Sequence, residues 1–147
     1  MFLSFFISLI SLFYLWGYLR VRVLFQPQNG GRVLFAATLS IKKGQSIALM
    51  IDQRVSEGIK VNFFGKPALT TSLPAQLAIK FDLPIVPVFI ERDANYNYLI
   101  KFFDPIKSTS LENKEEITKK LNQVLESMIL KNPNEWLWTH NRWKKKK

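Results

Sequence analysis

The chain has 147 residues, and its 21 lysines and arginines against 11 aspartates and glutamates give it a formal net charge of +10. Hydrophobic residues make up 48% of the sequence, which is too apolar for a disordered chain and enough for the core of about one domain. The absence of cysteine and the single histidine exclude disulfides, thiolate metal sites and multi-histidine metal sites, so we predict no metal. The positive charge predicts an anionic partner, which composition alone leaves open among nucleic acid, anionic lipid and an acidic substrate.

The first nineteen residues contain no charged side chain. As a helix they would extend about 28 Å, close to the hydrocarbon thickness of a bilayer. Arg20 and Arg22 follow with no basic residue before them, which predicts that the chain after this segment lies on the cytoplasmic side. We predict a hydrophobic membrane-associated helix over residues 1–20, either spanning the membrane or lying on it. A buried core helix and translated upstream sequence are the alternatives.

Helical and strand patterns alternate from Gly30 onward. The hydrophobic periodicity predicts helices over residues 32–43, 73–81 and 117–129. It predicts strands over residues 46–51, 83–90 and 98–103. Gly44 is typical of the residue that follows a helix, and Ser72 of a residue that caps one. These elements predict an α/β fold with a mixed sheet flanked by helices, preceded by the N-terminal hydrophobic helix.

The connections between these elements are predicted from turn and breaker residues. Residues 52–62 read as a polar loop, and residues 63–67 as a turn that exposes two phenylalanines. The two prolines within 83–90 indicate a sheet edge, a bulge or the ends of a strand. Asp93 to Asn97 predicts a turn into an antiparallel partner strand, and Thr109 to Glu112 matches a capping box.

Four residues stand where a ligand could be bound. Asp52 and Gln53 follow a buried strand, the place where α/β sheets present ligand-facing groups, although an ordinary polar loop also carries acids. Arg92 ends another strand, and it could hold a phosphate or form an exposed ion pair. His140 has no acid after it to orient its ring, so a structural or anion-contacting role is favoured over a general base.

The C-terminal segment combines aromatic and basic side chains. Trp136, Trp138 and Trp143 alternate with cations, as in surfaces that stack on single-stranded nucleic acid, and residues 144–147 form a basic tail of four lysines. A chain that opens with an apolar segment of bilayer length meets anionic lipid first, and lysines beside a membrane are attracted to an acidic leaflet. We therefore predict a membrane partner and no nucleic acid.

Several motifs occur together in one order along the chain. They are Gly44 to Gln53, Gly58, Phe63 to Ala68, Thr70, Ala75 to Ala78, Pro84 to Val88, Glu91-Arg92 and Asn132 to Lys144. In this order they resemble the bacterial lipid A late acyltransferases. The resemblance covers residues 28–144 and corresponds to the C-terminal portion of such a domain. Pro84 to Val88 also resembles a strand that lines the site of related glycerolipid acyltransferases, which implies a partial fold of that type.

The resemblance implies an inner-membrane enzyme of lipid A (lipopolysaccharide) biosynthesis. Such an enzyme moves a fatty acyl chain from an acyl carrier protein thioester to a hydroxyl of a Kdo-bearing lipid A precursor, with no other cofactor. A basic surface suits both the acidic carrier protein and the anionic acceptor. The family's strand-end aspartate falls on Asp52, and its closing histidine and arginine fall near His140 and Arg142, with Asn141 between them. With Gln53 and Arg92, these are the predicted substrate-binding or supporting residues.

The sequence departs from the family at the catalytic pair. The family's motif is a histidine followed five positions later by aspartate or glutamate, and no acid follows His140. We therefore predict no catalytic residue in this chain, since a general base typically contributes about 10²–10⁴-fold to the rate. The expectation is a truncated or split acyltransferase, inactive alone, with a separately encoded N-terminal half as its partner. The alternative is a catalytically inactive membrane-bound remnant that binds anionic lipid or acyl carrier protein.

Overall fold

The structure is a computed structural model that describes residues 21–24, 30–107 and 113–144. The chain divides into two compact units, Met1–Met50 and Ile51–Lys147. Within the described ranges, no helix has the length and apolar character needed to cross a membrane. The helix predicted over residues 1–20 lies outside the described residues.

The first unit is a strand, a helix and a strand. β1 (Val21–Leu24) pairs in parallel with β2 (Ser46–Leu49), and α2 (Gly30–Lys42) makes the crossover that parallel strands require. The helix ends where the N–H of Gly44 donates to the carbonyl of Ile41 at 2.9 Å, and Gly44 has a φ of +69°. The predicted helix over 32–43, the strand over 46–51 and the role of Gly44 are confirmed within a few residues.

The second unit begins with a β-hairpin that the sequence did not predict. β3 (Ile59–Phe63) pairs antiparallel with β4 (Lys66–Thr70), and Phe64 and Gly65 between them both have positive φ, as a two-residue hairpin turn requires. The prediction of a loop through residue 62 and of two exposed phenylalanines was wrong. Phe63 is completely buried, because the strand alternates exposed polar residues with buried apolar ones.

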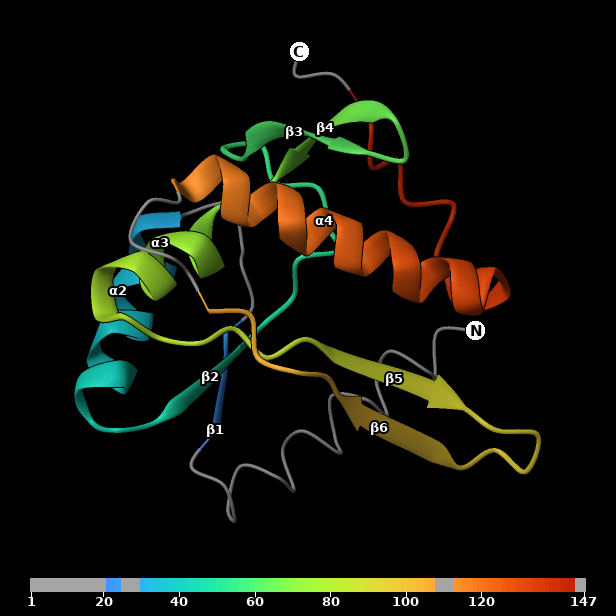
Figure 1. The fold of residues 1–147 in the computed structure, drawn as a ribbon, viewed down its shortest axis with the longest axis horizontal. Coiled ribbons are helices and arrows are strands. Elements are labelled where there is room, and N and C mark those ends of the chain that lie inside the picture. Colours follow the sequence, from blue (N-terminus) through green and yellow to red (C-terminus); the bar gives the residue numbers. More distant parts are fainter. Residues whose placement is uncertain (1–20, 25–29, 108–112, 145–147) are drawn as a thin grey trace. The chain divides into compact units, whose positions relative to one another are not determined.

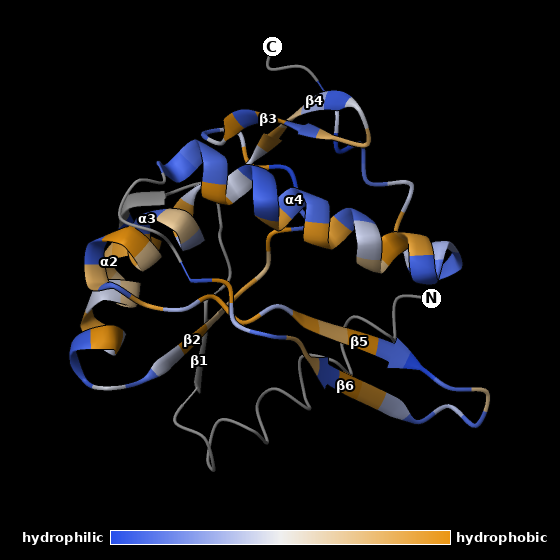
Figure 2. Ribbon diagram, viewed as in Figure 1, coloured by the Kyte–Doolittle hydropathy of each residue, from blue (hydrophilic) through white to orange (hydrophobic). Residues whose placement is uncertain are grey.

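Two helices of the second unit pack against each other: α3 (Leu73–Phe81) and α4 (Lys114–Lys131). The predicted helices at these positions are confirmed. Ser72 precedes α3 but makes no side-chain capping bond; the hydroxyl of Thr71 accepts the N–H of Leu73 instead. Figure 2 shows that α4 has one apolar side and one hydrophilic side, which matches its predicted amphipathic pattern.

The N-terminus of α4 carries a capping box. The side chain of Asn113 accepts the N–H groups of Glu115 and Glu116, and the Glu116 carboxylate accepts the N–H of Asn113. The box predicted at residues 109–112 lies outside the described residues. The helix ends at Lys131, before Pro133, as predicted, and a short 3-10 helix, η1 (Pro133–Glu135), follows it.

The last two strands form a second antiparallel hairpin, as predicted. β5 (Val88–Arg92) pairs with β6 (Tyr98–Phe102). The strand predicted over 83–90 begins only at Val88, because the prolines before it cannot donate to a ladder. Before β5, Ile85 forms one isolated bridge with Ile106.

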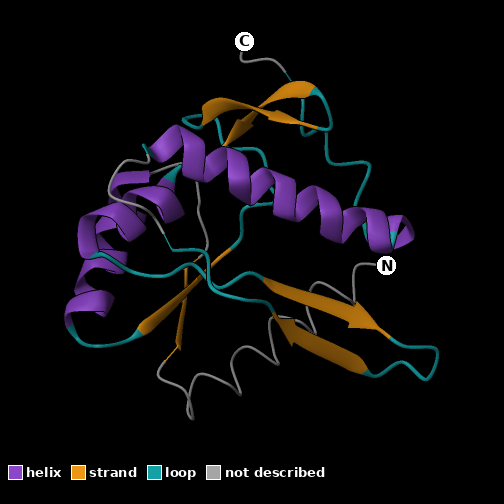
Figure 3. Cartoon of the chain, in the orientation of Figure 1, coloured by secondary structure: helices purple, strands orange, loops and turns teal. Residues whose placement is uncertain are grey.

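The described strands form three separate two-stranded sheets, one parallel and two antiparallel, rather than the single mixed sheet that was predicted (Figures 1 and 3). Pairing depends on contacts between distant segments, which hydrophobic periodicity does not report. In the second unit the helices, rather than a wide sheet, hold the core together, since α4 packs on both β3 and α3. One core cluster gathers around Phe63 and the other around Leu121.

Candidate functional site

Asp52 lies half-buried at the start of the second unit, on the segment that leads into β3. Its Oδ1 atom is buried and has no hydrogen-bond partner. Burial raises the pKa of the Asp52 carboxyl above its ordinary 3.8, and nearby backbone N–H groups and the charge of Arg142 oppose that rise. Asp52 is therefore an acid that is partly removed from water and lies near a buried cation.

The guanidinium of Arg142 is completely buried and joins the end of β4 to the segment that carries Asp52. Its Nη1 donates to the carbonyl of Leu69. Its Nη2 donates to the hydroxyl of Thr70 at 3.0 Å and to the carbonyl of Ile51 at 3.3 Å. Because Ile51 directly precedes Asp52, these bonds fix the backbone that carries the carboxylate. Arg142 thus supports the site from within the core instead of presenting its donors at the surface.

Burial has an electrostatic consequence for Arg142. It lowers the pKa of the guanidinium to about 10, an effect that the negative charge of Asp52 opposes. The side chain therefore remains a cation at neutral pH, and it lies over the ring of Phe63, 5.3 Å from the ring centroid. A cation in this position favours the charged form of Asp52, so the two residues stabilise each other's ionised state.

Thr70, at the end of β4, is the point where these contacts meet. Its hydroxyl accepts a hydrogen bond from Asn122 of α4 at 3.2 Å, in addition to the bond from Arg142. The same amide of Asn122 donates to the carbonyl of Asn62 at 3.0 Å. Gly58 packs on the backbone of Thr70 so closely that an added Cβ would lie 2.5 Å from its carbonyl oxygen. We call Gly58, Thr70, Asn122 and Arg142 the Thr70 hub.

His140 uses its Nε2 atom as a hydrogen-bond acceptor. The backbone N–H of Arg54 donates to it at 3.1 Å, and the Nε of Arg54 donates to the carbonyl of Lys144 at 2.9 Å. An N–H donor requires a lone pair on Nε2, so the ring in this arrangement carries its proton on Nδ1. The Nε2 lone pair is thus not free to take a proton from a substrate, which favours the structural role weighed for this residue.

Gln53 and Arg92 are both exposed, and the structure places them differently. Gln53 follows Asp52 directly. Arg92 ends β5, where its guanidinium lies 5.3 Å from the ring centroid of Tyr96 in the hairpin turn. Within the described part of the chain, Arg92 contacts that turn rather than Asp52, His140 or Arg142. The structure therefore brings together three of the five predicted residues, leaves Gln53 beside them and separates Arg92.

The sequence matches the model of the bacterial lipid A biosynthesis acyltransferase family over residues 15–145. The chain belongs to this family. A search of curated proteins found no significant match. The family match confirms the resemblance that the ordered motifs indicated, and it covers Asp52, His140, Arg142 and the whole Thr70 hub.

Sequence reasoning did not predict that Thr70, Asn122 and Gly58 would support the site of this acyltransferase-family domain. Asn122 did leave a signal. Together with Thr118, it falls on the apolar side of α4 at a spacing of four residues, and both side chains are completely buried. A polar residue inside an apolar stripe indicates a hydrogen-bonded core position. Gly58 left no comparable signal, because its close approach to Thr70 depends on tertiary packing.

The contacts at this site join a buried cation, a half-buried acid and the backbone that carries it. No group of three acidic, cysteine or histidine side chains that could bind a metal ion occurs among the described residues. Among the candidate residues, Asp52 has a buried carboxylate oxygen without a hydrogen-bond partner, and Arg142 fixes the backbone that precedes it. The arrangement therefore suits substrate orientation.

The raised pKa of Asp52 predicts a specific pH dependence of stability. Above pH 3.8 the unfolded chain loses a proton that the folded protein still holds, so the free energy of unfolding falls as the pH rises through the folded pKa. The size is about 1.4 kcal/mol for each tenfold difference in proton affinity. We expect Asp52→Asn and the wild-type chain to have the same free energy of unfolding near pH 3.8. Above the folded pKa of Asp52, the variant should be the more stable of the two, as measured by urea unfolding at a series of pH values.

Asp104→Asn is the control, because Asp104 is exposed. A stability difference between wild type and Asp52→Asn that stayed constant with pH would contradict a raised pKa for Asp52.

Proposed function

We propose that this chain supplies the substrate-orienting part of an acyltransferase that moves a fatty acyl chain from acyl carrier protein to a hydroxyl of a Kdo-bearing lipid A precursor. Membership of the lipid A biosynthesis acyltransferase family carries this proposal. The net charge of +10 supports it, because the proposed donor protein is acidic and the acceptor bears phosphates and carboxylates. The proposed fold is a part of the glycerolipid-acyltransferase type, with Pro84 to Val88 along the site.

In the proposed reaction, the acceptor hydroxyl attacks the thioester carbonyl carbon. The hydroxyl proton goes to a general base, and the carrier thiol leaves and takes up a proton. Asp52 would accept a hydrogen bond from a hydroxyl of the acceptor and so hold it in position, and Arg142 would keep Asp52 ionised and fixed. The oriented carboxylate is the contribution of this chain, because it acts by positioning the reactants.

In this proposal His140 is not the general base of the reaction. The chain contains one histidine, and its Nε2 atom accepts the backbone N–H of Arg54. We propose that a separately encoded partner provides the histidine and acid pair that the family uses. We also propose that the chain acts at the inner membrane with its bulk on the cytoplasmic face, anchored through residues 1–20.

The test is acyl transfer by the full chain in detergent micelles, with acyl carrier protein thioester and a Kdo-bearing lipid A precursor as substrates. The chain is assayed alone and with a polypeptide that carries the family's histidine and acid motif. We expect the partner to raise turnover by about 10²–10⁴-fold, the usual contribution of a general base. A partner in which that histidine is replaced by alanine is the control.

Within the complemented assay, Asp52→Asn is expected to abolish most of the activity without lowering the unfolding midpoint. Asp104→Asn, the exposed matched variant, is expected to leave activity unchanged. Equal activity of the two variants would show that Asp52 has no role in the proposed site.

A second candidate function is binding without catalysis at a membrane. The engaged Nε2 atom of His140 favours it, since this leaves the chain without a free imidazole base. In that case the chain would bind anionic lipid or acyl carrier protein, and no partner carrying the motif would produce turnover. That outcome would overturn the acyltransferase proposal for this chain.

A further inference from the structure

The end of α4 and the turns that follow it expose three large apolar side chains. Leu130 is 67% exposed, Leu137 48% and Trp138 54%. They belong to what we call the C-terminal segment, Leu130–Lys144. Tight turns keep this segment compact. The indole N–H of Trp138 donates to the carbonyl of Pro133 at 2.8 Å, and the backbone N–H of Trp138 donates to the carbonyl of Trp136 at 3.0 Å. The three side chains are therefore displayed within a short and folded stretch.

The C-terminal segment is anchored to the core of the second unit. The rings of Trp136 and Trp143 lie 6.1 and 5.7 Å from the ring of Phe63, measured between centroids. The indole of Trp143 also donates to the carbonyl of Phe63 at 3.1 Å. Since two of its tryptophans are held in this way, the exposure of Trp138 and the leucines belongs to a defined surface and not to a loose tail.

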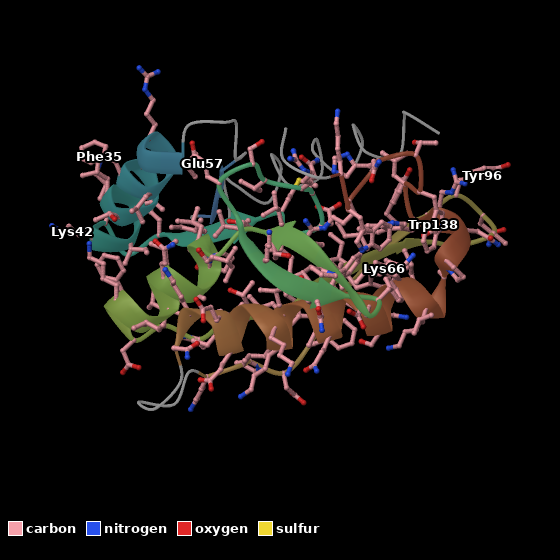
Figure 4. All side chains as sticks on the ribbon, turned by 90° about the horizontal axis from the view of Figure 1, so that it is seen from above. Phe35, Lys42, Glu57, Lys66, Tyr96 and Trp138 are labelled. Carbon is pink, nitrogen blue, oxygen red and sulfur yellow. The ribbon has the colours of Figure 1, made fainter. Side chains whose placement is uncertain are left out.

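Positive charge accompanies these apolar side chains in the sequence. Apart from the buried Arg142, residues 130–147 include five lysines and one acid, Glu135, and Lys131 and Lys144 are exposed. A further cation, Lys66, lies in the β3–β4 hairpin two residues after Phe64, whose ring is 6.4 Å from that of Trp138 (Figure 4). Apolar side chains bordered by lysines, with a tryptophan among them, match the chemistry of the headgroup region of an anionic bilayer.

We propose that the C-terminal segment docks on the surface of an anionic lipid bilayer. Leu130, Leu137 and Trp138 enter the boundary between headgroups and acyl chains, while the lysines contact lipid phosphates. This inference rests on the membrane association in the proposed function. It adds a second contact, made by the folded second unit and separate from residues 1–20, which would hold that unit against the lipid surface from which a lipid acceptor comes.

A bilayer explains this surface better than single-stranded nucleic acid does. Nucleic acid would need several accessible ring faces, because bases stack one on each ring. Of the three tryptophans here, Trp138 alone is more than half exposed, while Trp136 and Trp143 pack on Phe63. The exposed leucines have no part in stacking, but their burial in an acyl boundary is favourable.

The chain contains no cysteine, so a single introduced thiol can carry an environment-sensitive dye without background labelling. Leu137→Cys tests the segment. Ile79→Cys in α3 is the matched control, because Ile79 is an aliphatic residue of the same unit and is 46% exposed. The labelled full chains are added to vesicles of phosphatidylcholine alone or of phosphatidylcholine with phosphatidylglycerol. We expect the dye at position 137 to shift to shorter wavelength and to brighten several-fold on anionic vesicles, with little change at position 79.

The outcomes separate this inference from the proposed function. If the chain does not associate with either vesicle, both the membrane association and the docking surface are overturned. If it associates but the dye at 137 stays in water, or both dyes respond equally, only the docking surface is overturned. A response of the dye at 137 to a single-stranded oligonucleotide or to acyl carrier protein, with none to vesicles, would assign the segment to that partner and overturn lipid docking.

A charge variant adds an independent readout. Lys66→Gln combined with Lys131→Gln is expected to reduce the difference between anionic and neutral vesicles at position 137. Both lysines are exposed, Lys131 lies within the segment, and Lys66 follows Phe64, whose ring lies near that of Trp138. An unchanged difference would contradict the role of these lysines in docking.

Discussion

Arg142→Leu is expected to lower the free energy of unfolding by several kcal/mol, because each buried acceptor left without its donor costs about 1–3 kcal/mol. The leucine fills part of the space but leaves the carbonyls of Ile51 and Leu69 and the hydroxyl of Thr70 without their donor. It also removes the cation that favours ionised Asp52, so the pKa of Asp52 should rise further. Urea unfolding followed by tryptophan fluorescence measures the loss.

Arg92→Leu is the matched control for Arg142→Leu. Arg92 is exposed and its guanidinium lies over the ring of Tyr96 in the hairpin turn, so we expect a change of less than about 0.5 kcal/mol. Arg142→Lys should fall between the two, because lysine keeps the charge but cannot form the two-armed contact of a guanidinium. If Arg142→Leu unfolded at the same urea concentration as the wild-type chain, the buried guanidinium would not hold the site together.

The elements that sequence reasoning predicted correctly are those whose signals are local. The amphipathic repeat of α4 and the polar turn before β6 each occupy a short stretch and need no partner to be recognised. β3 was not predicted, because Lys60 and Asn62, which face solvent, make its five residues resemble the polar loop before them. β1 was not predicted, because its arginine resembles the basic flank of the apolar segment. Each of these strands is recognised only from its pairing with a partner strand.

The candidate site divides in the same way. Asp52 could be predicted because it follows a strand, and His140 and Arg142 because of a resemblance in the closing motif. The arrangement of these residues could not be predicted, since the bonds of Arg142 join residues 72 to 91 positions apart in the sequence. That Arg142 is a buried support and that His140 uses Nε2 structurally are facts of packing, which no periodicity reports.

The Thr70 hub connects the core of the second unit to the segment that carries Asp52. Helix α4 and the closing segment each donate one hydrogen bond to Thr70, the last residue of β4, so the position of Asp52 depends on three elements that meet at one residue. Because these contacts share Thr70, a change in any member should affect the others. Gly58, the one member with no side chain, offers the sharpest test of this dependence.

Gly58→Ala is expected to destabilise the protein by about 1–3 kcal/mol, the usual cost of overpacking a filled space. Its Cβ would lie 2.5, 2.8 and 2.9 Å from the O, C and N atoms of Thr70, and backbone atoms cannot swing aside as a flexible side chain can. The strand end must therefore move, and the bonds from Asn122 and Arg142 must move with it. Thermal and urea unfolding measure the loss of stability.

Gly65→Ala separates this clash from the ordinary effect of adding a methyl group. Nothing lies within 4 Å of a Cβ at Gly65, so its cost of about 1 kcal/mol comes from the positive φ alone. Because Gly58 and Asn122 act on the same residue, Gly58→Ala and Asn122→Ala should be non-additive by about 0.5–3 kcal/mol in a double-mutant cycle, whereas Gly65→Ala and Asn122→Ala should add. Additivity of both pairs would show that the contacts at Thr70 are independent, and the position of Asp52 would then not depend on a shared hub.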